Sequence, residues 1–210
     1  MKKFRFGGPG RVVIGLTGPI ASGKSFALDC FARAGAFCVS MDAVTASLLT
    51  EPALCNKISR KFGPEKILTN GRLDKKRLAA EVFGSPAKRK WLEGLLHPEI
   101  LARTHSLIKR SRKKIAVVET PLLFEAGLAE CFTFTVCLSA PRAQLAARAA
   151  GRGWTRGQYR SRAAAQFTAG KKYALADLVL DNSGTRAGLE EKIRSVCRSI
   201  GAAIIKRKKD

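Results

Sequence analysis

The feature that most constrains this chain is the glycine-rich run GLTGPIASGKS at residues 15–25. It overlaps the end of a β-branched apolar run, residues 11–18, which predicts a buried strand, and it leads into a helix-like run that begins KSFALDCF. The spacing G-x-x-x-x-G-K-S within residues 18–25 is that of a P-loop, which lies between a strand and a helix. Backbone N–H groups of such a loop point at phosphate oxygens. The sequence therefore predicts binding of a nucleoside triphosphate, with an ordinary glycine-rich turn before a helix as the alternative.

The side chains of this loop have separate expected roles. We expect Lys24 to reach the β- and γ-phosphates and the hydroxyl of Ser25 to ligate Mg²⁺. A side chain at position 23 would obstruct the close approach of a phosphate to the backbone. The residues expected to contact the nucleotide are Gly18, Pro19, Ile20, Ala21, Ser22, Gly23, Lys24, Ser25 and Phe26.

Strands and helices are predicted to alternate along most of the chain, which is typical of an α/β protein with a parallel sheet covered on both faces. The first helix has one apolar face, and Gly35 is a credible stop for it. That face is made of Phe26, Ala27, Cys30, Phe31 and Ala34. Further strands are expected within residues 36–42, 114–127, 133–140 and 176–184, before a C-terminal helix.

Residues 57–112 interrupt the alternation with a block of helices in which no strand is expected. His97-Pro98 is expected to punctuate this block, because the residue before a proline disfavours helix. A second irregular stretch, residues 148–172, is rich in arginine and is expected to form a mobile flap.

The composition limits the kinds of binding partner and the cellular compartment that we expect for this protein. There are 39 Lys and Arg residues against 16 Asp and Glu, a formal charge of +23, which favours anionic partners without choosing among them. The six cysteines form no C-x-x-C pair, so we expect free thiols rather than a zinc site or disulfides. No apolar run is long enough to span a membrane and no signal peptide is recognisable, so we expect a cytoplasmic protein.

Three sets of side chains are candidates for catalysis of phosphoryl transfer. Asp42 follows a predicted strand and could accept the proton of an attacking hydroxyl, or it could simply cap a helix. Glu119 ends the run VVE and could hold Mg²⁺ through water, or it could be a surface carboxylate at a strand end. Arg148 and Arg152 are four residues apart, so they would share a helical face and could close over phosphates, or that face could be solvated.

Taken together, these segments resemble the dephospho-coenzyme A kinase family from residue 13 to about residue 193. The resemblance is carried by IGLTGPIASGKS, VSMDA, NGRLDKKRLAAEVFGSPAKRKWLEGLLHPEI, VVETPLLFEAGL and ADLVLDNSG, of which LLHPEI and PLLFE are the most specific. It implies transfer of the γ-phosphate of ATP to the ribose 3′-hydroxyl of dephospho-coenzyme A, with Mg²⁺. It also implies a nucleotide core in three parts, residues 1–56, 113–140 and 173–210, a helical coenzyme-binding insertion, residues 57–112, and a lid, residues 141–172.

The resemblance assigns roles to individual residues. Asp42 matches the acid proposed as the base, Arg148 matches a lid arginine, and Glu119 matches the acidic position before PLLFE. We expect Asp42, Lys24 and Arg148 to be the catalytic residues. Gln166 matches a polar position of the lid and Asn182 the loop near adenine. Leu122, Phe124 and Glu125 are implied to border the acceptor. We expect Asp42 and His97 to bind the substrate as well, with a helix-end contact as the alternative for His97.

The chain departs from the family pattern at four positions. Pro19 and Ala21 stand where glycine is usual, Ser40 replaces the first Asp of a typical D-x-D, and Gly153 stands where an Asp is common. Pro19 removes one backbone donor from the loop. Because Gly23, Lys24, Ser25 and Asp42 remain, we expect an active enzyme. The alternatives are a P-loop kinase for another nucleoside or small alcohol, and a basic nucleic-acid-binding protein in which the P-loop only senses ATP. The oligomeric state is left open.

Overall fold

The computed structural model describes residues 4–8 and 10–206 of the chain. It divides into two compact units. The first, called the sheet unit here, comprises residues 1–40 and 108–210, and the second, called the helical unit, comprises residues 41–107. The last four residues of the predicted C-terminal core segment, 207–210, lie outside the described part.

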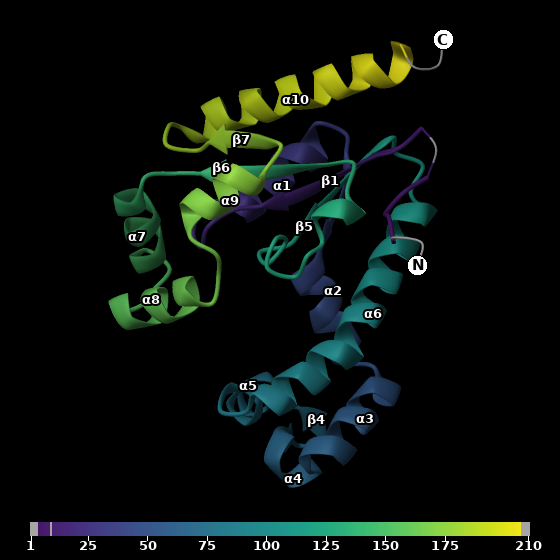
Figure 1. The fold of residues 1–210 in the computed structure, drawn as a ribbon, viewed down its shortest axis with the longest axis vertical. Helices are drawn as coiled ribbons and strands as arrows, with labels where there is room; N and C mark the ends of the chain where they lie inside the picture. The colour runs from purple at the N-terminus through teal and green to yellow at the C-terminus, as the bar shows by residue number, and fades with distance from the viewer. Residues whose placement is uncertain (1–3, 9, 207–210) are drawn as a thin grey trace. The chain divides into compact units, whose positions relative to one another are not determined.

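The sheet unit is built on five parallel strands in the order β2-β5-β1-β6-β7 (Figure 1). Each strand that the sequence predicts is present, and the α/β class is confirmed. The strand β1, which carries the P-loop, lies in the centre of the sheet, so its carboxyl end has a neighbouring strand on either side. The strands are β1 (Val12–Thr17), β2 (Phe37–Ser40), β5 (Ile115–Glu119), β6 (Phe134–Ser139) and β7 (Leu178–Asp181).

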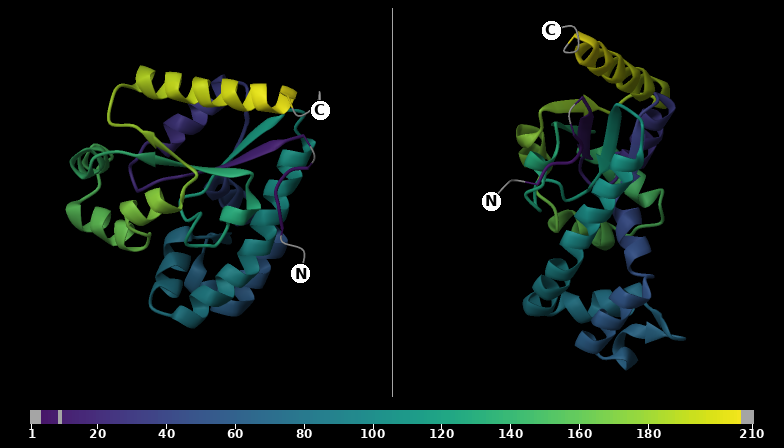
Figure 2. Two further views of the ribbon diagram at one scale, coloured as in Figure 1. Left: turned by 45° about the horizontal axis from the view of Figure 1, so that its top comes forward. Right: turned by 90° about the vertical axis from the view of Figure 1, so that its right-hand side faces the viewer.

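One face of this sheet is covered by α1 (Lys24–Arg33) and α10 (Arg186–Lys206), and both views of Figure 2 show α10 lying along the sheet. Alternate strand residues point into this layer, as the period of two requires. The predicted apolar face of α1 is confirmed, because Ala27, Cys30 and Phe31 are buried in the same core. Gly35 follows the helix with a φ of +91°, so the predicted glycine stop is also confirmed.

The opposite face is closed by loops and by α9 (Ala169–Leu175), which packs against β6. A Cβ atom placed on Gly15 of β1 would lie 2.6 Å from Leu123 and 2.7 Å from Phe132. These two side chains therefore pack directly on the strand backbone, which only glycine permits. After β6 the chain forms α7 (Arg142–Ala150) and α8 (Arg156–Ala164), and a short 3₁₀ turn, Ala129–Cys131, precedes β6.

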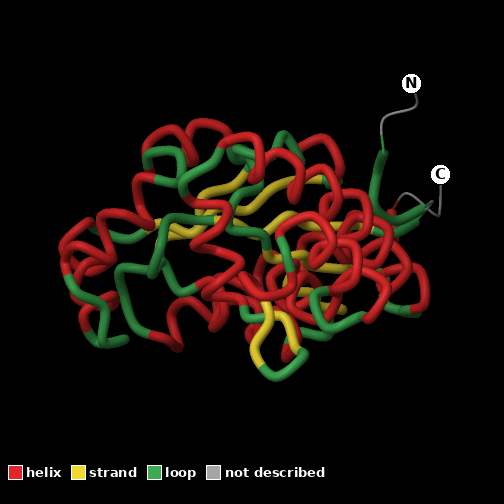
Figure 3. Tube along the Cα trace, turned by 90° about the horizontal axis from the view of Figure 1, so that it is seen from below, coloured by secondary structure: helices red, strands yellow, loops and turns green. Residues whose placement is uncertain are grey.

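The helical unit contains a feature that the sequence reading missed. Two short strands, β3 (Leu68–Thr69) and β4 (Arg72–Leu73), pair antiparallel, so the expectation of helices alone was wrong (Figure 3). The turn between them is Asn70-Gly71, with φ values of +52° and +72°. Asn-Gly is the strongest short-range signal for a two-residue hairpin. The helices of this unit are α2 (Met41–Leu48), α3 (Pro52–Phe62), α4 (Pro64–Ile67), α5 (Lys75–Phe83) and α6 (Pro86–Arg110), whose last residues belong to the sheet unit.

The punctuation expected at His97-Pro98 was also wrong, because α6 runs through Pro98 without ending. A proline inside a helix forfeits one backbone hydrogen bond, here to the carbonyl four residues earlier. Packing on both sides of it, with Leu96 and Thr104 buried, stabilises the continuous helix. Among the described residues no helix is both long and apolar enough to cross a membrane.

Candidate active site

The P-loop owes its shape to residues in the left-handed region of φ. Gly18 has a φ of +151°, Ala21 of +61° and Gly23 of +94°. A Cβ atom on Gly18 would lie 2.7 Å from Ser22 Oγ and 2.9 Å from the carbonyl oxygen of Leu138. A Cβ atom on Gly23 would lie 2.4 Å from Asn182 Nδ2. Both glycines of the pattern are therefore required by contacts in this structure as well as by φ.

The loop opens α1 with its N-terminal N–H groups uncovered by a side chain. Gly23 is the N-cap residue, and none of the side chains that the structure describes caps this helix by a hydrogen bond. Uncapped N–H groups and the positive end of the helix dipole favour an anion there. The Lys24 ammonium donates to the carbonyl oxygens of Gly18, at 3.0 Å, and Pro19, at 3.1 Å, and thus lies across the loop. Ser25 is exposed in the first turn of the helix.

The two departures from glycine are accommodated in different ways. Ala21 is buried in a left-handed conformation, which costs an L-residue about 1–2 kcal/mol. Pro19 lacks an N–H, but its carbonyl oxygen accepts from the Ser22 N–H at 3.1 Å and from Lys24. Pro19 therefore contributes to the loop as an acceptor.

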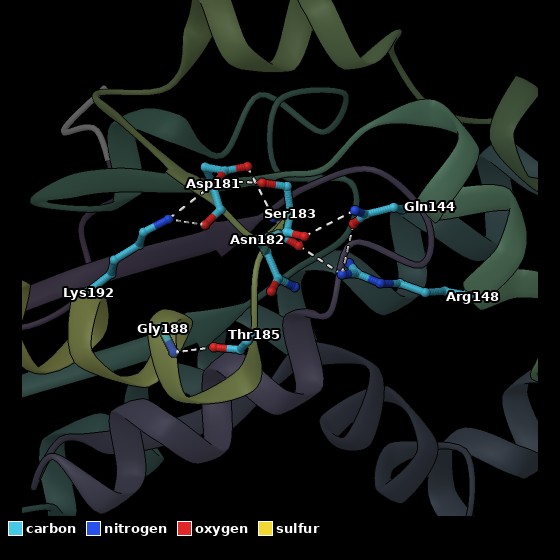
Figure 4. Close-up of polar contacts among 8 residues, drawn as sticks. All are labelled: Gln144, Arg148, Asp181, Asn182, Ser183, Thr185, Gly188 and Lys192. Carbon is cyan, nitrogen blue, oxygen red and sulfur yellow. Dashed lines mark hydrogen bonds and ion pairs between the residues drawn. The ribbon is translucent and has the colours of Figure 1, made fainter.

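Asn182 braces the loop from the segment that follows β7. Its buried side chain donates from Nδ2 to the carbonyl oxygen of Ser22 at 2.8 Å, and its backbone N–H donates to Ser139 at 2.8 Å. The Arg148 guanidinium donates to the Asn182 carbonyl oxygen at 2.8 Å and to Gln144 at 3.2 Å. The close-up in Figure 4 shows these residues converging from α7 and from the turn after β7. The structure thus brings together two residues that the sequence proposed separately, Arg148 and Asn182.

The turn that holds Asn182 is fixed on its other side as well (Figure 4). Gln144 Nε2 donates to the Ser183 carbonyl oxygen at 3.0 Å, and the Ser183 hydroxyl donates to Asp181 at 2.7 Å. The hydrogen bond from Ser183, with help from Lys192, holds the pKa of the Asp181 carboxyl below its usual value. The turn that carries Asn182 is therefore anchored to both α7 and α10.

Arg152 does not share a helical face with Arg148, and that expectation was wrong. The helix α7 ends at Ala150, so Arg152 lies beyond it. Its guanidinium lies 5.9 Å from the centre of the Trp154 ring. Gln166 lies between α8 and α9, where its N–H donates to the carbonyl oxygen of Ala163 at 3.1 Å.

Glu119 ends β5, which pairs with both β1 and β2. Its Cα registers with Leu16 on one side and Ser40 on the other, and the residue is 8% exposed. Glu119 therefore lies at the carboxyl edge of the sheet, beside the strand that leads into the P-loop. Among the described residues no group of three or more His, Cys, Asp or Glu side chains could hold a metal. Mg²⁺ is commonly held by one or two protein oxygens together with substrate phosphates, and the oxygen donors of Ser25 and Glu119 fit that chemistry.

The PLLFE segment forms a compact turn after β5, residues 121–127. Leu122 is 43% exposed, whereas Leu123 is fully buried and Phe124 nearly so. The Glu125 carboxylate accepts from the Lys172 ammonium at 2.9 Å and from the backbone N–H of Phe167 at 2.7 Å. Burial raises the pKa of the Glu125 carboxyl, but its hydrogen bonds to Lys172 and to backbone N–H groups, together with the charge of Lys172, hold the pKa below its ordinary value.

Lys172 is a residue of this region that the sequence reading missed. Its side chain is fully buried, and its ammonium also donates to the carbonyl oxygen of Pro121 at 2.5 Å. A lysine next to another lysine in an Arg-rich stretch has the pattern of a solvated residue, so no sequence signal marked it.

Asp42 and His97 belong to the helical unit and are exposed, Asp42 in the first turn of α2 and His97 within α6. The other candidate residues belong to the sheet unit.

Comparisons with known proteins converge on one family. A family profile described as dephospho-CoA kinase matches residues 12–188. The dephospho-CoA kinase of Thermobifida fusca is 34% identical over 187 residues, which cover 87% of this chain and 93% of that protein. A crystal structure of a Thermus thermophilus protein matches with a TM-score of 0.82 and 31% identity, covering 90% of this chain and 97% of that one. The dephospho-CoA kinase of Campylobacter jejuni matches with a TM-score of 0.68 and 25% identity, covering 91% and 98%.

Proposed function

The chain belongs to the dephospho-CoA kinase family, and from that premise we propose which of its residues carry out the last step of coenzyme A biosynthesis. The reaction moves the γ-phosphate of ATP to the ribose 3′-hydroxyl of dephospho-coenzyme A. The observation that carries the proposal is the geometry of the P-loop, with its two required glycines, its uncapped helix N-terminus and Lys24 lying across it. Two small anionic substrates and a basic chain suit each other electrostatically. We expect the reaction to take place in the cytoplasm.

The P-loop would bind the polyphosphate of ATP. Main-chain N–H groups at the N-terminus of α1 would donate to phosphate oxygens, and Lys24 would turn from its carbonyl partners toward the migrating phosphate. Arg148, held by Gln144 and the Asn182 carbonyl, would place a second positive charge near the transferred group. In a loose transition state most of the catalytic effect comes from such positioning and charge stabilisation.

The residues that would hold Mg²⁺ are Ser25, directly through its hydroxyl, and Glu119, through water. When bound, the metal would neutralise negative charge that develops on the phosphate oxygens. Ser25 follows the lysine of the loop, and Glu119 terminates the strand next to β1. Their oxygen donors would orient the phosphate chain in the loop.

The acceptor would be prepared by Asp42. Its exposed carboxylate follows β2 by two residues and would accept the proton of the ribose 3′-hydroxyl as the phosphate arrives. We propose that His97 of the helical insertion, residues 57–112, and Leu122, Phe124 and Glu125 border the coenzyme. The lid, residues 141–172, would close over ATP and exclude water.

Acceptor-dependent release of ADP tests the proposed function. The purified protein with ATP and Mg²⁺ is expected to release ADP only slowly, and addition of dephospho-coenzyme A is expected to accelerate the release. A panel of other nucleosides and small alcohols serves as the control for acceptor class. No acceleration by dephospho-coenzyme A, or equal acceleration by unrelated alcohols, would overturn the assignment of substrate.

A further inference from the structure

We propose that Glu125 and Lys172 are positioning residues, which lock the end of the lid to the turn that borders the acceptor. The proposal rests on the proposed function, because it concerns the same lid and the same acceptor. The two segments joined are the PLLFE turn, residues 121–127, and the lid exit, residues 167–172, and both belong to the sheet unit.

The ion pair can hold the two segments together because separating it would leave a buried charge without a partner. The Lys172 side chain is fully buried and that of Glu125 is 14% exposed, and their charged atoms are 2.9 Å apart. A buried ammonium is strongly unfavourable unless it is paired and hydrogen-bonded. Lys172 meets both conditions through Glu125 and through the carbonyl oxygen of Pro121, which are the last and first residues of the PLLFE sequence.

The Glu125 carboxylate is bound by groups of the protein, so Glu125 would border the coenzyme through its turn and not through its charge. The carboxylate oxygen that accepts from Lys172 also accepts from the Phe167 N–H, so a single atom binds both ends of the lid exit. The second oxygen is buried and, among the described residues, has no hydrogen-bond partner. Glu125 therefore acts on the acceptor through the position of its turn, and Leu122 is the residue that this turn exposes.

The PLLFE turn is also fixed to the strand that carries the P-loop. The Thr17 hydroxyl donates to the Pro121 carbonyl oxygen at 3.3 Å, and Thr17 immediately precedes Gly18. Leu123 packs on the backbone of Gly15 in the same strand. The lid exit and the P-loop strand are thus both bound to the PLLFE turn. The contacts are the hydrogen bonds of Lys172 and Thr17 to the Pro121 carbonyl oxygen and the ion pair between Glu125 and Lys172. Loosening the pair would shift the lid and the acceptor turn relative to the P-loop strand.

This geometry predicts a kinetic signature that loss of fold would not produce. A displacement of about 1 Å at a reacting centre can cost about 10²-fold in rate. A lid that closes imperfectly also admits water, which competes with the acceptor hydroxyl for the phosphate. We therefore expect acceptor-dependent turnover to fall while acceptor-independent release of ADP, relative to it, rises.

The experiment compares Glu125→Gln, Lys172→Met and the double variant with the unaltered enzyme. Glu125→Gln keeps the shape and an acceptor for the Phe167 N–H, and the double variant leaves no unpaired charge if Lys172→Met alone fails to fold. Glu190→Gln is the matched control, because it neutralises a carboxylate of a surface ion pair with Arg33. The readouts are kcat, KM for dephospho-coenzyme A, acceptor-independent ADP release, and circular dichroism at the assay temperature.

Each single variant is expected to lower kcat by about 10–100-fold and to raise the ratio of acceptor-independent to acceptor-dependent release at least about tenfold. The double variant is expected to be no worse than the more impaired single variant, because the two residues act as one unit. Normal kinetics in all three variants, an unchanged ratio, or a KM defect confined to Glu125→Gln would overturn the proposal. If the unaltered enzyme itself shows no acceptor-dependent release, the proposed function fails and this proposal with it.

Discussion

Replacing Gly23 by alanine tests whether the P-loop is braced as the structure indicates. The new Cβ would stand 2.4 Å from Asn182 Nδ2, well inside contact distance, at a residue whose φ is +94°. Asn182 would have to swing away and give up its 2.8 Å hydrogen bond to the Ser22 carbonyl oxygen. Leaving such a buried polar group unsatisfied costs about 1–3 kcal/mol. The left-handed backbone adds about 1–2 kcal/mol of strain for any L-residue.

Gly35 provides a control that separates these two costs. Its φ of +91° nearly equals that of Gly23, but a Cβ there would have no atom of the described residues within 4 Å. Gly35→Ala should therefore carry the backbone strain alone, and the difference between the variants isolates the clash with Asn182. At about 2–4 °C per kcal/mol, Gly23→Ala should melt about 2–12 °C below Gly35→Ala.

Thermal unfolding and calorimetric titration with ATP are the assays. Gly23→Ala is expected to weaken ATP binding by about 5–150-fold, the factor that corresponds to about 1–3 kcal/mol, whereas Gly35→Ala should bind normally. Equal melting temperatures for the two variants, or unchanged ATP affinity in Gly23→Ala, would show that Asn182 does not support the P-loop.

Three further outcomes are expected. Asp42→Asn should lower kcat by about 10²–10⁴-fold with little change in ATP affinity, and near-normal turnover would exclude Asp42 as the base. Asn182→Asp, in which an oxygen faces the Ser22 carbonyl in place of the donor, should weaken ATP binding by about 5–150-fold in titration, and unchanged affinity would refute a role for that donor. The depressed pKa of Glu125 stabilises the fold above its ordinary value of 4.5, and this contribution is lost as the pH falls through the lower folded-state pKa. Across that acid range the melting temperature should therefore change less with pH for Glu125→Gln than for the unaltered protein. An identical dependence of the melting temperature on pH in the two proteins would count against a stabilising ion pair.

Features encoded by short local patterns could be predicted from the sequence. The P-loop needed only its spacing and its place between a strand and a helix, and the structure supplies the strained φ values that the glycines allow. The face of α1 followed from helical periodicity, and its end followed from Gly35. In each case the determining residues lie within about two helical turns of one another, so no distant partner is needed.

Features that depend on distant partners could not be predicted. The helix α6 continues through Pro98 because packing elsewhere outweighs one lost hydrogen bond, which no local rule can weigh. Lys172 is buried only because Glu125 and Pro121, about fifty residues earlier, come to meet it. The strand order is likewise a property of the whole sheet. The hairpin at Asn70-Gly71 is different, because its signal was local and was overlooked.

The same difference between local patterns and distant partners applies to the candidate site. The sequence placed Asn182 near the nucleotide by resemblance, but the hydrogen bond of its side chain to Ser22 depends on β7 ending beside β6, whose Ser139 receives the Asn182 N–H. Glu125 was proposed at the acceptor by the same route, and its ion pair required the fold. The chemical identity of the site residues could thus be predicted from the sequence, whereas the hydrogen bonds and ion pairs that hold them in place could not.

The proposed reaction transfers the γ-phosphate of ATP held by the P-loop to one specific hydroxyl. The most direct measurement incubates the protein with γ-labelled ATP, Mg²⁺ and dephospho-coenzyme A and locates the label in the products. We expect the label in a phosphomonoester on the ribose 3′-oxygen of coenzyme A, formed together with ADP. Label found only in inorganic phosphate, or on another position of the acceptor, would contradict it.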